Sequence, residues 1–468
     1  MLFTHRPLDP ALTIAAIATP PGEGGVAIIR ISGKDAREIA SRVFSRPAHL
    51  LRSHTVYFGK FLNDQGSTID EGLAIVMQAP KSFTGEDVVE FHCHGSSLLA
   101  KNLLETVLKA GARMAGPGEF TRRAFLNGKI DLAQAEAVQA LIAAKNTLAI
   151  KAAEQQLEGR LSERIRHFQR NLTDIAAILE AWVDFPEEGL EFASFDELTY
   201  QLEQLLDEIK TLESTFHHGR LLQEGFTLCL AGRPNAGKSS LLNALLGFER
   251  AIVTPIPGTT RDLLQEDLRL GDLHFRITDT AGLRRTDELI EQEGIRRTKK
   301  AILEADLILF VVDGTRGIEE EDEEILRHLP WEKSLIVWNK CDLSSAASLP
   351  MFTEENCKTS WRTMSLVRIS ALKNLGIEEL KKTVESLLWK EPLPDKQEVM
   401  LTNVRHYEAL QQTIQSIESL LKGLKEGVSP EFLAADMRHA LRELGTIIGS
   451  DITEEILNAI FAKFCVGK

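Results

Sequence analysis

A phosphate-binding loop in the middle of the chain constrains the fold more than any other sequence feature. The apolar run at 226–231, FTLCLA, passes directly into GRPNAGKSS, so residues 232–239 match GxxxxGK[ST], and the apolar run LLNALL follows. Glycines let the backbone wrap a phosphate with its N–H groups, Lys238 can bridge phosphates, and the Ser239 hydroxyl can bind Mg²⁺. The order of strand, loop and helix predicts a P-loop nucleotide-binding domain, and a chance turn is the less favoured interpretation.

Three further motifs follow the P-loop. The expected strand HFRIT at 274–278 is followed by DTAG, the expected buried strand LIVW at 335–338 is followed by NKCD, and SALKN occupies 370–374. Asp342 can accept hydrogen bonds from guanine N1–H and the exocyclic amine, whereas adenine presents the opposite pattern and would leave buried polar groups unpaired. Each motif alone is more often a plain turn, but four in order over about 140 residues predict a GTPase domain. The residues expected at the nucleotide are Asn235, Ala236, Gly237, Lys238, Ser239, Ser240, Asp279, Thr280, Ala281, Gly282, Asn339, Lys340, Asp342, Ser370 and Ala371, with Lys238 also counted as catalytic.

The segment between the P-loop and DTAG supplies a second set of candidates. Ras-like enzymes place a glutamine directly after the DxxG glycine to orient the attacking water, but this chain has Leu283 there, so hydrolysis must be assisted differently. Thr260 in PIPGTTRD is the natural second Mg²⁺ ligand beside Ser239, and the carbonyl groups of residues 251–257 are available to a monovalent cation. The loop residues expected near GTP are Thr254, Pro255, Ile256, Pro257, Gly258, Thr259 and Thr260.

The sequence on either side of this domain indicates two further kinds of structure. Residues 1–130 are rich in glycine turns and short β-like runs, which predicts an α+β domain. Residues 131–224 and 391–468 repeat apolar side chains at three- or four-residue intervals, which predicts amphipathic helices. Each helical block needs a partner for its apolar stripe, so we expect the two blocks to pack together, with residues 225–390 inserted between them. The predicted fold class is therefore multidomain, α+β and α/β, with a discontinuous helical bundle.

Composition narrows the class of protein. The 468 residues include 68 acidic and 54 basic side chains, for a net charge of −14, and 43% are hydrophobic. This excludes disordered and collagen-like chains and argues against coating nucleic acid by bulk positive charge, although a local basic patch remains possible. The five cysteines lack paired CxxC spacing, which fits neither a disulfide framework nor a zinc ribbon. No stretch of about 18 uncharged apolar residues occurs, so we expect a cytoplasmic protein without a membrane span.

The flanking segments resemble those of one family closely. TPPGEGGVAIIRISG, SFTGEDVVEFHCHG, GPGEFTRRAFLNGKIDLAQAEAV, the GTPase loops and the terminal FCVGK are similar to signature segments of the tRNA-modification GTPase MnmE (TrmE) family. The resemblance covers essentially the whole chain. It implies a folate-binding N-terminal domain that also dimerises, a discontinuous helical domain and an inserted Ras-like GTPase domain.

The resemblance also implies a function. A homodimeric, potassium-activated GTPase would join the FAD-dependent protein MnmG in a heterotetramer and add a carboxymethylaminomethyl or aminomethyl group at carbon 5 of the wobble uridine of certain tRNAs. A tetrahydrofolate one-carbon carrier, 5,10-methylenetetrahydrofolate, would donate the methylene carbon. Two alternatives remain open: a ribosome-assembly or RNA-binding switch GTPase without folate chemistry, and a stand-alone folate-dependent transferase with a regulatory GTPase.

Carried over position by position, the resemblance gives roles to residues of the GTPase segment. K⁺ would be held by Asn235 together with oxygens of Thr254, Ile256 and Thr259, where two GTPase domains meet face to face. Glu291 would position the attacking water in place of the absent glutamine. From the residues alone, a glutamate in DELIEQEG is more often a solvated helix charge.

The same reasoning gives roles to the two ends of the chain. The implied folate contacts are Arg30, Glu90, Lys129 and the terminal Lys468, since a carboxylate can pair with the donor edge of a pterin and basic side chains can bind an anionic tail. Cys465 is suspected of taking part in the chemistry, and a plain free thiol is the alternative. Arg30 and Glu90 alone also fit an ion pair between adjacent strands.

Two histidines, His92 and His94, flank Cys93 in an expected strand. A metal site needs more ligands on one side of a strand than this segment offers, so we interpret both histidines as packing or local polar contacts rather than zinc ligands.

Overall fold

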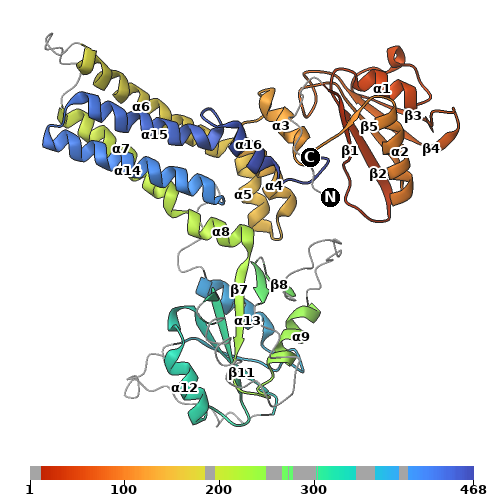
Figure 1. Cartoon of the computed structure of the whole chain (residues 1–468). Helices are drawn as coiled ribbons and strands as arrows, with labels where there is room; N and C mark the ends of the chain where they lie inside the picture. The colour runs from red at the N-terminus through yellow and green to blue at the C-terminus, as the bar shows by residue number, and fades with distance from the viewer. Residues whose placement is uncertain are drawn as a thin grey trace. The chain divides into compact units, whose positions relative to one another are not determined.

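The chain divides into two compact units, which are described separately. The computed structural model describes residues 12–184, 195–248, 266–271, 273–277, 302, 304–343, 364–388 and 399–468 (Figure 1). The first unit comprises Met1–Ile142, Ala153–Thr211 and Arg405–Lys468, and the second comprises Ala143–Ala152 and Leu212–Val404.

The first unit begins with a six-stranded sheet in the order β3-β4-β5-β2-β1-β6. All neighbouring strands are antiparallel except β1 and β6, which are parallel. Side chains alternate between the two faces, and helices α1 and α2 cover one of them over a core of aliphatic and aromatic residues (Figure 1). The elements are β1 (Ile14–Ile17), β2 (Gly24–Ser32), α1 (Ala36–Val43), η1 (Ala48–Leu50), β3 (Thr55–Leu62), β4 (Thr68–Met77), β5 (Val88–Gly95), α2 (Ser97–Lys109), β6 (Arg113–Met114) and α3 (Glu119–Leu126).

The rest of the first unit is helical. Helix α6 packs against α15, and ion pairs join α7 to α14, with Lys210 Nζ 2.7 Å from Glu418 Oε1 and Lys425 Nζ 3.1 Å from Glu203 Oε1. Helices from before and after the second unit therefore share one bundle (Figure 1). The helices are α4 (Leu132–Ala143), α6 (Arg160–Asp184), α7 (Phe195–Ser214), α14 (Val404–Glu426), α15 (Pro430–Ile448) and α16 (Glu454–Phe461), while α5 (Thr147–Leu157) spans the division between the units.

The second unit is a three-layered α/β structure around a sheet in the order β12-β11-β10-β7-β9-β8. The strands are parallel apart from β8, and their near-continuous apolar sequences reflect burial on both faces. Helices α9 and α13 contribute to the core on one face, and α12 to the core on the other. The elements are α8 (Phe216–Glu224), β7 (Phe226–Ala231), α9 (Lys238–Phe248), β8 (Glu266–Leu270), β9 (Leu273–Ile277), β10 (Leu307–Asp313), α12 (Glu320–His328), η2 (Trp331–Lys333), β11 (Ser334–Asn339), β12 (Leu366–Arg368) and α13 (Ile377–Leu388).

The predicted fold class is confirmed: an α+β domain, a discontinuous helical bundle and an inserted α/β domain with a parallel sheet. Among the described residues, no helix is both long enough and apolar enough to cross a bilayer.

Candidate functional site

The P-loop lies between the carboxyl end of β7 and the first turn of α9, and its glycines are required by close approaches. Gly232 has a φ of +129°, and a Cβ there would lie 2.2 Å from the Val311 carbonyl oxygen. Gly237 has a φ of +99°, and a Cβ there would lie 2.1 Å from Asn339 Nδ2. Only glycine fits these positions, so the neighbouring strands shape the backbone of the loop.

Lys238, the first residue of α9, folds back over the P-loop. Its Nζ donates to the carbonyl oxygens of Gly232 at 2.6 Å and Arg233 at 2.8 Å. Burial of this ammonium lowers its pKa, because a charged amine is less well solvated inside the loop than in water. The N-terminus of α9 adds free N–H groups beside this cation, which is the arrangement that binds phosphate.

The base-recognition loop braces the P-loop through Asn339, the last residue of β11. Asn339 Nδ2 donates to the Ala236 carbonyl oxygen at 3.0 Å, while its Oδ1 accepts from the Lys340 N–H at 2.8 Å and the Ala371 N–H at 3.1 Å. The N–H of Ala371, one of the residues expected at the nucleotide, is thus engaged by Asn339 in this structure. The side-chain amide of Asn339 ties three loops together.

Asp342 lies next in this loop. A hydrogen bond from Ser370 lowers the pKa of its carboxyl group, and Lys373, with Nζ 3.4 Å from Oδ2, lowers it further. The group is therefore an ionised acceptor at neutral pH, as pairing with guanine N1–H and the amino group requires.

Two contacts near the P-loop were not predicted from the sequence. Arg233 pairs with both Glu319 and Asp322 at the start of α12, with Nε 2.9 Å from Asp322 Oδ2. Asp313, which ends β10, lies 2.5 Å from the Lys340 ammonium. An aspartate directly after the apolar run LILFVV is the one local signal that marks Asp313 in advance.

Several predicted site residues lie outside the described residues. They are Thr254, Pro255, Ile256, Pro257, Gly258, Thr259, Thr260, Asp279, Thr280, Ala281, Gly282 and Glu291. Ser239 and Ser240 are described, and both belong to the first turn of α9.

A second cluster of candidates lies in the N-terminal sheet of the first unit. Arg30 on β2 and Glu90 on β5 are directly opposite in the strand register, with Nε 2.7 Å from Oε1, so the predicted ion pair between adjacent strands is confirmed. The Arg30 guanidinium lies 5.8 Å from the centre of the Phe83 ring and 5.7 Å from that of Phe120. These contacts hold the guanidinium rigidly and leave further N–H donors of its five for a ligand.

The C-terminal tail reaches the same cluster. The Gly467 carbonyl oxygen accepts from Arg30 Nη1 at 3.3 Å, and Val466 pairs with Pro117 in an isolated bridge. Burial lowers the pKa of the Lys468 ammonium, and the nearby Arg30 charge lowers it further, against the opposing effect of Glu90. The structure therefore brings Arg30, Glu90 and Lys468 together, with exposed Cys465 beside them.

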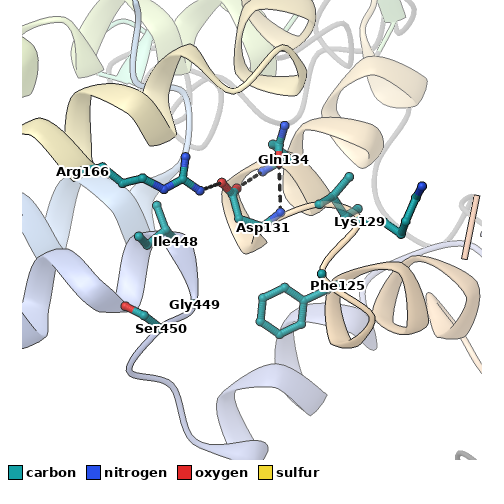
Figure 2. Close-up of a pocket in the computed structure, with 10 residues that line it drawn as sticks. Phe125, Lys129, Asp131, Gln134, Arg166, Ile448, Gly449 and Ser450 are labelled. Atoms are coloured by element: carbon teal, nitrogen blue, oxygen red, sulfur yellow. Dashed lines mark hydrogen bonds and ion pairs between the residues drawn. The ribbon is translucent and has the colours of Figure 1, made fainter. Parts of the chain in front are cut away.

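The contacts described for that cluster do not include Lys129. It lines a separate pocket of about 370 Å³. Figure 2 shows its side chain pointing away from the Asp131–Arg166 ion pair at the centre of this pocket, and its Nζ donates to the Pro80 carbonyl oxygen at 3.1 Å.

The two histidines of β5 make local polar contacts, as interpreted from the sequence. His94 Nδ1 lies 2.8 Å from Asp70 Oδ1, and His92 Nε2 lies 3.5 Å from Glu90 Oε2.

A parallel sheet carrying a P-loop, with an NKxD loop bracing it from the next strands, defines a P-loop GTPase. Family models described as "GTP-binding protein TrmE N-terminus" and "MnmE helical domain" match residues 13–129 and 132–465. The chain belongs to the MnmE family of tRNA modification GTPases.

Relatives bearing the name tRNA modification GTPase MnmE match over their whole length. The protein of Protochlamydia amoebophila is 54% identical over 468 residues, covering 100% of both chains. Those of Geobacter sulfurreducens and Syntrophotalea carbinolica are 42% and 44% identical, each covering 97% of this chain and 99% of the relative. GTP hydrolysis in tRNA modification, with GTP and Mg²⁺ at the P-loop, follows from the family. The resemblance seen in the sequence is confirmed.

The P-loop fits a magnesium nucleotide on its own evidence. The Val311 carbonyl oxygen leaves no room for a Cβ at Gly232, and the Asn339 side chain leaves none at Gly237. The Lys238 ammonium is directed into the loop, and Ser239 offers a hydroxyl group at the start of α9. Bound Mg²⁺ would neutralise charge on the phosphates and would be held by Ser239.

Proposed function

We propose that this protein is a potassium-activated GTPase that works with the FAD-dependent protein MnmG on the wobble uridine of certain tRNAs. The product carries a carboxymethylaminomethyl or aminomethyl group at carbon 5. The proposal rests on one observation: Arg30, Glu90 and Lys468 meet in one cluster. A protein that acted only through its GTPase domain would not need this charged cluster in a separate domain.

The chemistry of this cluster supports a one-carbon folate as its ligand. Glu90 is an acceptor for the donor edge of a pterin, while Arg30 and Lys468 are cations for the anionic tail. The aromatic rings of Phe83 and Phe120 fix the Arg30 guanidinium, so it needs little reordering on binding. The bound tetrahydrofolate supplies the carbon that is transferred. Cys465 is proposed as a participant in the chemistry. Lys129, whose Nζ donates to the Pro80 carbonyl oxygen outside this cluster, is proposed as a further binding residue.

In the GTPase domain, we assign base selection to Asn339 and Asp342 and Mg²⁺ binding to Ser239 and Thr260. Water positioning is assigned to Glu291. K⁺ is assigned to Asn235 together with oxygens of Thr254, Ile256 and Thr259. The backbone of Asn235 has a φ of +64°, which is a left-handed conformation imposed by the loop. A cation at this position supplies positive charge where other GTPases use an arginine.

Exposed apolar side chains on strands β3 and β4 of the N-terminal sheet support a homodimer. Val56 and Phe58 on β3 are 54% and 64% exposed, and Phe58 lies directly opposite Leu73 on β4, which is 38% exposed. Contiguous exposed apolar residues of this kind mark protein interfaces. We propose that a second copy of this chain covers this β3–β4 face.

The heterotetramer with MnmG, the cytoplasmic location and the domain boundaries at 1–130, 131–224, 225–390 and 391–468 are parts of the same proposal. The net charge of −14 supports a division of labour in which the partner binds most of the tRNA backbone.

Reconstitution tests the whole function. The full chain, the flavoprotein partner, GTP, K⁺, 5,10-methylenetetrahydrofolate, FAD, NADH, glycine or ammonium and an unmodified tRNA are combined, and nucleosides are analysed by mass spectrometry. We expect modified uridine only when every protein and the folate are present. GTP hydrolysis without any modified uridine would favour the RNA-switch alternative, and modification without the flavoprotein would favour the stand-alone transferase.

A further inference from the structure

The ammonium of Lys340 bridges two loops of the GTPase domain. Its Nζ is 2.5 Å from Asp313 Oδ2 and 3.0 Å from the backbone carbonyl oxygen of Asn235. Asp313 ends β10, and in the parallel register it is paired with Asn339, which ends β11 just before Lys340. The register therefore brings the carboxylate and the ammonium to the same edge of the sheet, beside the P-loop.

Lys340 and the P-loop residue that its ammonium contacts, Asn235, both have unusual backbones. Asn235 has a φ of +64° and Lys340 a φ of +61°, and they are two of the four described non-glycine residues with positive φ. The left-handed conformation is unfavourable for a residue with a Cβ, because the Cβ lies too close to a carbonyl oxygen. Such conformations persist where the surrounding contacts determine them, and they gather at functional sites.

The Lys340 contact also helps to set the orientation of two peptide groups in the P-loop. Lys340 holds the carbonyl oxygen of Asn235, and Asn339 holds that of Ala236 at 3.0 Å. In a trans peptide the C=O and the following N–H point in opposite directions. The two carbonyl groups are thus turned toward the base-recognition loop, and the N–H of Gly237 is turned away from it.

Asp313 is itself held firmly. Its Oδ1 accepts from the Thr315 N–H at 3.0 Å and the Thr315 hydroxyl at 2.6 Å, which leaves Oδ2 for Lys340. Burial raises the pKa of the Asp313 carboxyl group, but the hydrogen bonds from Lys340 and Thr315 and the charge of Lys340 lower it overall. Asp313 is therefore an anion at neutral pH, and its side chain is only 12% exposed.

We propose that Asp313 is a positioning residue for GTP binding, which acts by holding the Lys340 ammonium on the Asn235 carbonyl and so fixing the P-loop. Asp313 has no direct role in the chemistry. Without its charge, Lys340 loses the partner that keeps it over the P-loop, and the two left-handed backbones are no longer fixed. Nucleotide affinity falls, while the guanine contacts of Asp342 are unchanged.

The test uses Asp313→Asn in the full-length protein, with fluorescent GDP and GTP analogues to measure Kd and the dissociation rate. We expect Kd to rise about tenfold, mainly through faster dissociation, with the preference for guanine over xanthine unchanged. The matched control is Asp306→Asn, at the opposite end of β10, where the carboxylate accepts from the Thr227 N–H at 2.8 Å. This control is expected to leave Kd within about twofold.

A double-mutant cycle separates positioning from a general structural role. In a Lys340→Met background, Asp313→Asn is expected to change Kd by less than about twofold, because the ammonium through which Asp313 acts is already absent. Thr315→Val, which removes the hydroxyl donor to Oδ1, provides a milder variant with an expected rise in Kd of about threefold, and it carries the test if Asp313→Asn does not fold. A Kd for Asp313→Asn no greater than that of the control, an equal effect with Lys340→Met present, or an unchanged Kd in a folded Thr315→Val protein would each overturn the proposal.

Discussion

Glu136 on α4 and Arg405 on α14 meet in a two-point ion pair, with Arg405 Nε 3.0 Å from Oε1 and Nη2 2.6 Å from Oε2. The neighbouring His406 is fully buried, and its Nε2 lies 2.7 Å from the same Oε2. Arg405 also donates to the carbonyl oxygens of Thr446 and Ile447 in the last turn of α15. One buried cluster therefore joins three helices and caps the carbonyl end of α15.

This cluster makes the stability of the first unit sensitive to acid. Burial would raise the pKa of Glu136, but the charge and hydrogen bonds of His406 and Arg405 lower it from 4.5 to about 2. A carboxyl group with a lowered folded-state pKa stabilises the native state above its unfolded-state pKa, and this contribution is lost as the pH falls from about 4.5 to about 2. Glu136→Gln is expected to reduce the free energy of unfolding by about 2–4 kcal/mol at pH 7 and by much less at pH 2.5, measured by urea denaturation.

The matched control for that prediction is Glu418→Gln. Glu418 pairs with Lys210 between α14 and α7, but its side chain is 49% exposed, so removing the pair is expected to cost less than about 1 kcal/mol. Equal losses in the two variants, or a Glu136→Gln loss of the same size at both pH values, would contradict the assignment.

Base selection is expected to depend on Asp342. Replacing one carboxylate oxygen by an amide nitrogen in Asp342→Asn removes the acceptor for the exocyclic amine of guanine and provides a donor to the carbonyl oxygen at carbon 2 of xanthine. We expect GTP affinity to fall on the order of 10²-fold and affinity for xanthosine triphosphate to rise. Competition binding with the two nucleotides measures this, and retained discrimination against xanthine would show that Asp342 does not contact the base.

Potassium activation is expected to require the Asn235 side chain. Replacing Na⁺ by K⁺ should raise wild-type GTP turnover at least about tenfold, because a cation at the phosphates stabilises developing charge. Since Asn235 has a φ of +64°, Asn235→Ala adds backbone strain, whereas Asn235→Gly removes the side-chain oxygen alone. Both variants should lose the response to K⁺, and Asn235→Gly should retain nucleotide affinity. Equal turnover in the two salts for the wild type, or a full response in Asn235→Gly, would remove the K⁺ site.

The β3–β4 face is expected to hold the dimer together. A charge in its centre, in Phe58→Glu, should convert the protein to a monomer at micromolar concentration, measured by sedimentation equilibrium. Ile150→Glu is the control, because that side chain is also exposed, at 39%, but belongs to α5. A wild-type monomer, or a Phe58→Glu dimer of unchanged affinity, would contradict the proposed interface.

The sequence predicts those site residues whose identity a local motif specifies. Gly232, Gly237 and Asn339 could be assigned from the sequence because the GxxxxGK[ST] and NKxD patterns specify those residue types. In the structure, neighbouring residues leave no room for a Cβ at either glycine, and Asn339 braces the P-loop. The Arg233–Asp322 and Asp313–Lys340 pairs could not, since they depend on which loops the sheet register brings together. Motif spacing is local, whereas these contacts are tertiary.

The N-terminal sheet shows the same limit. The period-two alternation of β3 predicts a strand with two different faces, but not which face the helices cover, so the exposed Phe58 could not be identified in advance. The contact of Arg30 with Gly467 joins residues 437 positions apart, and only the resemblance to a family indicated that the two ends of the chain share a site.

The proposed function depends above all on the binding of a one-carbon folate by the N-terminal domain against the C-terminal tail. Calorimetric titration of the full chain with 5-formyltetrahydrofolate tests it most directly, alongside Arg30→Ala and Gly467→Ala. Gly467 has a φ of +98°, and a Cβ there would lie 2.4 Å from the Ile17 carbonyl oxygen, so alanine should displace the tail. We expect saturable binding by the wild type and about tenfold weaker binding by both variants, with unchanged circular dichroism. No binding by folded, GTP-hydrolysing wild-type protein would contradict it.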